Sequence, residues 1–160
     1  MGLEQAKQFV GKESSAIPAL DAVSTSDIRH WRELMEGKKE SWNTSVAPPA
    51  MTLAWAMPAL WPKKVEATEP HEQVLKLFDG EGFGVAVGIG LDQEYLKPVR
   101  LGDRLSYKVK VAGVSSSEED TKYGKGYKVN LLYTFTNQEG EVVSRQSCTV
   151  LKSRALSPVG

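Results

Sequence analysis

The hydrophobic and polar positions divide the chain into a first part with helical spacing and a second part with strand spacing. In the segment from Thr25 to Glu36, "TSDIRHWRELME", Thr25 or Ser26 can cap a helix and Gly37 can end it. Its apolar residues follow helical intervals: Ile28, Trp31, Leu34 and Met35. The pattern predicts a short amphipathic helix.

A long apolar stretch follows at residues 45–62, "SVAPPAMTLAWAMPALWP". Pro48 and Pro49 suit a helix entry, because the N–H groups of a first turn have no partners within the helix. Nearly every position from Ala50 to Leu60 is apolar, which predicts a helix buried on all sides, bent or ended by Pro58. The stretch is shorter than the roughly 20 residues that span a bilayer, and its prolines also disfavour a membrane segment.

The next region, from Pro62 to Gly82, is charged and irregular, with a possible short helix in "HEQVLKLF". We interpret it as a variable insertion, at about residues 62–82, within a single domain that spans residues 1–160. No repeat, low-complexity run or second domain is evident in the sequence.

From Val85 onward the apolar positions alternate with polar ones, which predicts antiparallel strands in "VAVGIGLDQEYLKPV", "LSYKVKVAGV", "GYKVNLLYTF" and "EVVSRQSCTVLK". The loop "TNQEG" predicts a hairpin turn in which Gly140 takes a positive φ, and "SSSEEDTKYGKG" a longer polar loop. Two faces should be buried: Leu105, Tyr107, Val109 and Val111 on one strand, and Tyr127, Val129, Leu131, Tyr133 and Phe135 on the next. These elements predict an α+β fold, a curved antiparallel sheet wrapped around the helix at residues 50–60.

Composition narrows the class of protein. The chain has 160 residues, of which 41% are apolar and 25% charged, as in one soluble globular domain. Its 20 basic and 20 acidic residues cancel, so charge favours neither nucleic acid nor a membrane as partner. The start "MGLEQAKQFVGKE" has no signal-peptide pattern, and Cys148 is the sole cysteine, which excludes an internal disulfide. These features favour the cytoplasm.

Four segments, taken in order, resemble the MaoC-like hot-dog proteins: "IRHWRELMEG", "VAPPAMTLAWAMPAL", "QEYLKPVRLGDRLSYKVKV" and "YTFTNQEGEVV". The resemblance is closest to the N-terminal dehydratase-like domains of acyl-CoA hydratase complexes, including those that act on steroid side-chain CoA thioesters. It implies a hot-dog fold with residues 50–60 as the central helix. It also implies dimers of hot dogs with an acyl-CoA thioester in a tunnel at their interface, and no cofactor besides the coenzyme A of the substrate.

Active members of that family are R-specific enoyl-CoA hydratases, whose Asp and His lie in a "GDxNPxH" type of motif between the first and the central helix. The corresponding interval here, "MEGKKESWNTSVAPPAM", holds neither Asp nor His. Water addition needs a base beside the water and a proton donor for the α-carbon. We therefore hypothesise a non-catalytic subunit that forms one side of the acyl-CoA tunnel and pairs with a second hot-dog subunit carrying the Asp and His.

Two alternatives stay open. The chain can be a self-sufficient homodimeric hot-dog hydratase, or a thioesterase in which Glu36 or Glu40 activates water. It can also be a non-enzymatic acyl-CoA-binding or scaffold module.

The candidate substrate-binding residues fall in two places. At the start of the apolar helix, free N–H groups and the positive end of the dipole can polarise a thioester carbonyl. Lys97 and Arg100 flank Pro98, and the resembling proteins place basic residues near the CoA phosphates, although a solvated charge pair explains them equally well. The full set is Ala47, Pro48, Pro49, Ala50, Met51, Trp55, Tyr95, Lys97 and Arg100.

Other chemistry-bearing residues have simpler interpretations. His30 lies inside the first helix and His71 in the insertion, where we expect it to face solvent; two isolated histidines predict no metal site. Gly102 and Asp103 read as a turn. Three further sets lack a convincing partner or role: Lys122 and Lys125 in the polar loop, Ser147, and Cys148, which we expect to behave as a small hydrophobe.

Overall fold

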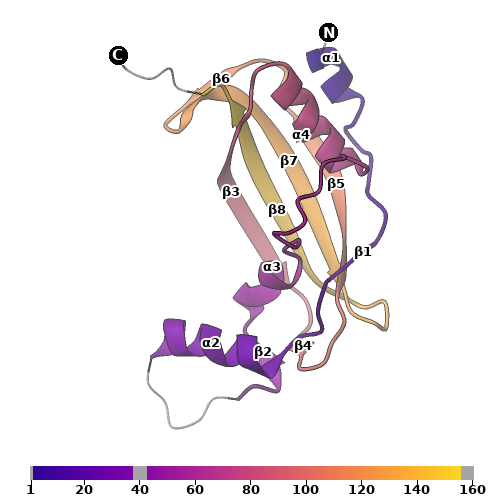
Figure 1. Ribbon diagram of the computed structural model, residues 1–160, viewed down its shortest axis with the longest axis vertical. Coiled ribbons are helices and arrows are strands. Elements are labelled where there is room, and N and C mark those ends of the chain that lie inside the picture. Colours follow the sequence, from indigo (N-terminus) through magenta and orange to yellow (C-terminus); the bar gives the residue numbers. More distant parts are fainter. Residues whose placement is uncertain (1, 38–42, 156–160) are drawn as a thin grey trace.

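One antiparallel sheet organises the chain, in the order β1-β5-β7-β8-β3 (Figure 1). Its strands are β1 (Ile17–Pro18), β3 (Val85–Tyr95), β5 (Ser106–Val114), β7 (Gly124–Thr136) and β8 (Val142–Ser153), with the short β6 (Glu119–Thr121) paired to β7. A separate pair joins β2 (Val46–Ala47) to β4 (Val99–Arg100). This structure, a computed structural model, describes residues 2–37 and 43–155.

The strands follow the alternation of the sequence. Val109 and Val111 of β5 and Val129 of β7 are fully buried on the helix side of the sheet, as predicted. Gly140, with φ at 77°, makes the predicted hairpin turn between β7 and β8. The second polar loop is shorter than expected, because its end forms β6 and turns back through Gly124, whose φ is 127°.

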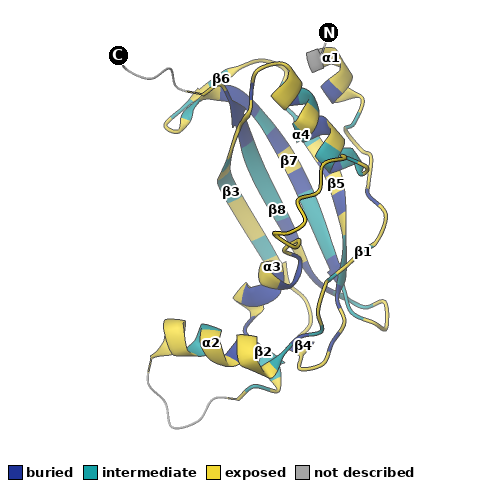
Figure 2. Ribbon diagram, viewed as in Figure 1, coloured by how far each residue is buried: buried dark blue, intermediate teal, exposed yellow. Residues whose placement is uncertain are grey.

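The helix that the sheet curves around is α4 (Pro70–Gly80), as Figures 1 and 2 show. Val74 and Phe78 are fully buried against the sheet, and the Phe78 ring stacks on Tyr127 with 5.4 Å between the ring centroids. At its start, Pro70 occupies the first turn and the Glu72 carboxylate accepts from the backbone N–H of Glu69, 3.2 Å away. The segment that we interpreted as a variable insertion therefore contains the central helix.

The prediction of one buried helix from Ala50 to Leu60 is wrong. The stretch forms a 3₁₀ turn, η1 (Pro49–Met51), and one helical turn, α3 (Thr52–Trp55). Pro58 explains the early end, because the residue before a proline avoids the helical conformation. Beyond that point no sheet covers the apolar side chains, and Leu60 and Trp61 are 90% and 85% exposed.

The first predicted helix is confirmed as α2 (Thr25–Glu36), and Gly37 ends it with φ at 75°. Its cap is Ser24, one residue before the expected ones, whose hydroxyl accepts from the Asp27 N–H at 3.3 Å. Only its first turns are covered: Ile28 is fully buried, whereas Leu34 is 85% exposed. The reason is its position, because α2 lies beyond one end of the sheet (Figure 1).

Two apolar clusters result. The first fills the space between α4 and the sheet, and α1 (Gly2–Lys7) joins it through the buried Ala6. The second lies where α2, η1, α3 and β4 meet the end of the sheet, and it holds the candidate site in place. Its buried residues are Val23, Ile28, Ala47, Met51, Trp55, Ala56, Val99, Leu105, Phe135 and Val143.

Candidate functional site

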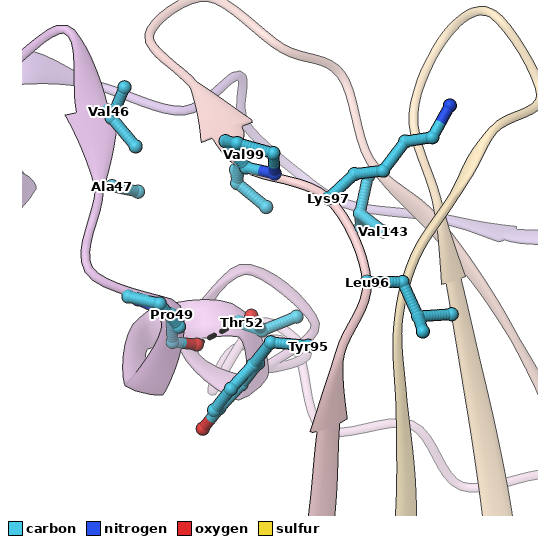
Figure 3. Close-up of a pocket in the computed structure, with 10 residues that line it drawn as sticks. Val46, Ala47, Pro49, Thr52, Tyr95, Leu96, Lys97, Val99 and Val143 are labelled. Carbon is cyan, nitrogen blue, oxygen red and sulfur yellow. Dashed lines mark hydrogen bonds between the residues drawn. The ribbon is translucent and has the colours of Figure 1, made fainter.

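A pocket of about 290 Å³ lies beside this second cluster, between the end of β3, the β2–β4 pair and η1 (Figure 3). Four of the predicted substrate-binding residues line it: Ala47, Pro49, Tyr95 and Lys97. Sequence reasoning missed the rest of the wall, which is Val46, Thr52, Leu96, Pro98, Val99 and Val143. All of these except Val143 are next to a predicted residue in the chain, which is the signal that could have found them. Val143 joins the wall only through the tertiary structure.

Backbone pairing holds the walls in place. Ala47 pairs with Val99 across β2 and β4, which brings two distant segments to one side of the pocket. On the other side, the backbone N–H groups of Leu96 and Lys97 both donate to the Val143 carbonyl oxygen, at 2.8 and 3.1 Å. The pocket wall is therefore built largely of backbone-anchored apolar residues.

The polar groups of the pocket are occupied by neighbours. The Thr52 hydroxyl donates to the Pro49 carbonyl oxygen at 2.7 Å, and the Tyr95 hydroxyl donates to Gln93 Oε1. The Lys97 ammonium donates to the Glu141 carboxylate, and this contact lowers the pKa of Glu141 to about 2. Figure 3 shows the Lys97 side chain extending away from Ala47 and Pro49.

Arg100 lies outside this pocket and lines a neighbouring one of about 300 Å³ with Lys97. Three carboxylates share that second pocket with the two cations: Asp103, Glu139 and Glu141. With three carboxylates beside two cations, the charge of this second pocket does not favour binding of an anionic phosphate group. Asp103 acts in the turn, as predicted, since its carboxylate accepts from the Arg100 N–H at 2.8 Å and from Gln138 Nε2 at 3.0 Å.

The other predicted residues divide between core and surface. Met51 and Trp55 are buried in the second cluster and Pro48 is buried, whereas Ala50 is exposed; none of them lines the pocket. The helix start expected at this place is that of α3, which has only four residues, and a helix dipole grows with the number of aligned peptide units.

The two histidines lie away from the pocket. His30 is exposed on α2, where its Nε2 lies 3.3 Å from Arg29 Nη2. His71 does not face solvent as expected: it is only 9% exposed in the first turn of α4, and its Nδ1 has no hydrogen-bond partner among the described residues. Burial lowers the pKa of His71, against the opposing effect of Glu72 and Glu69.

The remaining candidates offer no nucleophile or metal site. Glu36 Oε1 lies 2.5 Å from Arg32 Nη1, and Glu40 lies outside the described residues. Burial raises the pKa of the Cys148 thiol, which disfavours the reactive thiolate. Within residues 2–37 and 43–155, no three His, Cys, Asp or Glu side chains gather as metal ligands, and no helix is long and apolar enough to cross a membrane.

Lys122 and Lys125 act locally at the β6–β7 hairpin. The Lys122 ammonium lies 4.9 Å from the centre of the Tyr123 ring, and Lys125 pairs with Asp120 in the strand register. Both are accounted for without a nucleotide.

Comparison with known proteins gives a family match over most of the chain. Residues 9–146 match the sequence profile of the family described as FAS1-like, dehydratase domain region. The probable enoyl-CoA hydratase alpha subunit of Thermomonospora curvata is 30% identical over 148 residues, which cover 84% of this chain and 46% of that protein. The chain thus spans about half the length of this curated relative.

Solved structures confirm the predicted hot-dog fold. A chain of the ChsH1-ChsH2 complex from Mycobacterium tuberculosis matches with a TM-score of 0.79 and 24% identity, over 96% of this chain and 94% of that chain. A MaoC-like dehydratase matches with a TM-score of 0.61 and 19% identity, over 96% of this chain and 45% of that one. The HadBC (3R-hydroxyacyl-ACP dehydratase) complex from M. tuberculosis matches with a TM-score of 0.52 and 19% identity, over 86% and 95%.

Proposed function

The chain belongs to the FAS1-like dehydratase-region family, and on that premise we propose that it is a non-catalytic subunit of an R-specific enoyl-CoA hydratase complex. In this role its apolar pocket forms one side of the acyl-CoA tunnel. A second hot-dog subunit contributes the Asp and the His. The coenzyme A thioester is the substrate, and the protein retains no cofactor of its own.

The composition of the pocket wall carries this proposal. Among the described residues that line the pocket, none is Asp, Glu or His. The polar groups that do line it, on Thr52, Tyr95 and Lys97, are each bonded to a neighbour. Hydration of an enoyl thioester needs a positioned base and a positioned proton donor. This wall supplies shape and an apolar surface, so the acid–base groups come from elsewhere.

The position of β3 supports a partner subunit. β3 is the last strand of the sheet in the described part of the chain, so there one row of its backbone groups has no strand neighbour. Such an edge readily pairs with a strand of another chain. Tyr95 ends β3 and lines the pocket, so a subunit bound along this edge brings its own residues beside the pocket. A relative of about twice the length also fits a unit of two hot dogs.

The acyl group is a fatty-acyl or steroid-derived one in this proposal, because the wall is dominated by Val46, Leu96, Val99 and Val143. A wall of this kind binds through apolar burial. The balanced charge of the chain gives no attraction to nucleic acid or to an anionic membrane surface. We place the complex in the cytoplasm.

The test uses the purified chain alone and mixed with a hot-dog subunit that carries the Asp and His motif. Hydration and hydrolysis of trans-2-enoyl-CoA thioesters are followed in both samples. We expect hydration in the mixture and none by the chain alone. A matched control replaces the motif Asp of the added subunit by Asn, which should abolish hydration while the two chains still associate.

Other outcomes identify the alternatives. Hydration or thioester hydrolysis by the chain alone contradicts the non-catalytic role; Glu36→Gln and Glu40→Gln then show whether either carboxylate activates water. Binding of acyl-CoA without turnover in either sample favours a non-enzymatic binding or scaffold module.

A further inference from the structure

A row of polar side chains lies on the helix-facing side of the sheet, on the neighbouring strands β7, β8 and β3. Residues directly opposite each other in an antiparallel sheet share a face. Tyr133 of β7 lies opposite Gln146 of β8, which lies opposite Gln93 of β3. In the adjacent row, Phe135 lies opposite Ser144, and Ser144 opposite Tyr95. We call Tyr95, Gln93, Gln146, Ser144 and Tyr133 the polar strip.

Side-chain hydrogen bonds connect this strip to the pocket. The Tyr95 hydroxyl, at the pocket wall, donates to Gln93 Oε1, and Gln93 Nε2 donates to Gln146 Oε1 at 3.0 Å. Figure 3 shows Tyr95 beside Pro49 and Thr52, so the connection begins within the site. It ends at Gln146, whose Nε2 is a further hydrogen-bond donor.

Two of these side chains are buried, and one of them has an unpaired hydroxyl. Gln146 and Ser144 are each only 3% exposed, and the Ser144 hydroxyl has no hydrogen-bond partner in the described part of the chain. An unpaired buried polar group costs free energy that a partner recovers. Burial also raises the pKa of Tyr133 to about 12, so its hydroxyl is protonated at neutral pH and able to donate.

The other half of the same face shows that polarity here is not a requirement of the fold. On β5 and β7 the equivalent positions are Val109, Val111, Val129 and Leu131, all buried against α4. If the β8 part of this face served only for packing in the core, apolar residues would suffice there too. A purely aliphatic ligand would leave the Ser144 hydroxyl unpaired.

We infer that the acyl group bound by this chain carries an uncharged oxygen acceptor, a hydroxyl or keto group, on the part that passes Tyr95, and that Gln146 and Ser144 hydrogen-bond it. This inference rests on the proposed function and names its substrate class. The apolar pocket holds the hydrocarbon part of the acyl group, and the polar strip selects acyl groups with an oxygen beyond it.

The experiment compares binding of octanoyl-, decanoyl- and dodecanoyl-CoA with binding of their ω-hydroxy counterparts to the purified chain, by isothermal titration calorimetry. We expect the ω-hydroxy form to bind about fivefold more tightly for at least one chain length, which corresponds to roughly 1 kcal/mol. The variants Gln146→Leu and Ser144→Ala should reduce that preference while they retain binding of the unsubstituted acyl-CoA.

Ser147→Ala is the matched control, because Ser147 is next to Gln146 on β8 and points to the opposite face of the sheet. It should keep the full preference. Equal binding of both series by the wild-type chain, or a preference unchanged in both Gln146→Leu and Ser144→Ala, overturns the inference and leaves the proposed function standing. Failure of every acyl-CoA to bind, both to the chain alone and to its mixture with the second hot-dog subunit, overturns the proposed function as well.

Discussion

At the scale of the residue, the burial of His71 couples folding to pH. The side chain lies in the first turn of α4, and burial lowers its pKa, with Glu72 and Glu69 acting in the opposite direction and Lys64 in the same one. An unfolded chain binds a proton at a histidine with a pKa of about 6.5. The folded chain resists that proton, so His71 stabilises the fold in full only above this value.

We predict that the free energy of unfolding falls as the pH is lowered from about 7.5 to about 5, because the unfolded state then binds a proton that folded His71 does not. In His71→Gln, which cannot be protonated, this part of the fall should be absent. Urea unfolding at a series of pH values measures it. His30→Gln is the control: His30 is exposed on α2, and the variant should keep the wild-type pH dependence. The same dependence in His71→Gln and wild type would contradict the prediction.

At the scale of the element, α4 contributes buried side chains to the core, whereas the end of the apolar stretch at residues 45–62 does not. Phe78 of α4 is fully buried and stacks on Tyr127, whereas Trp61, in the apolar stretch first expected to be central, is 85% exposed. Stability should therefore depend on α4 far more than on the exposed Leu60 and Trp61.

Replacing Phe78 by Ala should lower the free energy of unfolding by about 3 to 5 kcal/mol, since it removes buried apolar area and leaves a cavity. Trp61→Ala should change it by less than about 0.5 kcal/mol. Urea unfolding of the isolated chain measures both, and Phe78→Leu gives an intermediate loss if the Ala variant does not fold. A larger loss of stability in Trp61→Ala than in Phe78→Leu would contradict the prediction that α4 forms the core with the sheet.

At the scale of the whole molecule, the free edge of β3 determines how the hot dog can assemble. The strand closes one side of the sheet, and its Leu91 is 52% exposed although it is apolar. Charged residues on an edge strand oppose association with another strand.

We predict that Leu91→Lys weakens association with a hot-dog partner at least tenfold in Kd while the stability of the isolated chain changes by about 0.5 kcal/mol or less. Sedimentation velocity of the mixture measures the association. Tyr123→Lys is the control, because Tyr123 is as exposed as Leu91, at 50%, but lies in the β6–β7 turn rather than in β3. An association that survives Leu91→Lys but not Tyr123→Lys would move the interface to the hairpin.

The sequence by itself determined the features that depend on near neighbours in the chain. Alternation on β5 and β7 predicted which side chains, such as Val109 and Leu131, face the core. Helical spacing predicted α2, and Gly140 and Asp103 were recognised as turn residues. Resemblance over four segments added the hot-dog fold. The expected helix start and the resemblance together indicated four of the residues that line the pocket.

Only the tertiary structure decided which helix is central and what completes the pocket. An apolar residue is buried only if another element covers it, and sequence spacing does not reveal the cover: α4 packs on the sheet with Val74 and Phe78, while Leu60 and Trp61 extend past it. The burial of His71 could not be predicted from the sequence for the same reason. The pocket joins Ala47, Tyr95 and Val143 from segments far apart in the chain, and their meeting depends on strand pairing that local sequence does not encode.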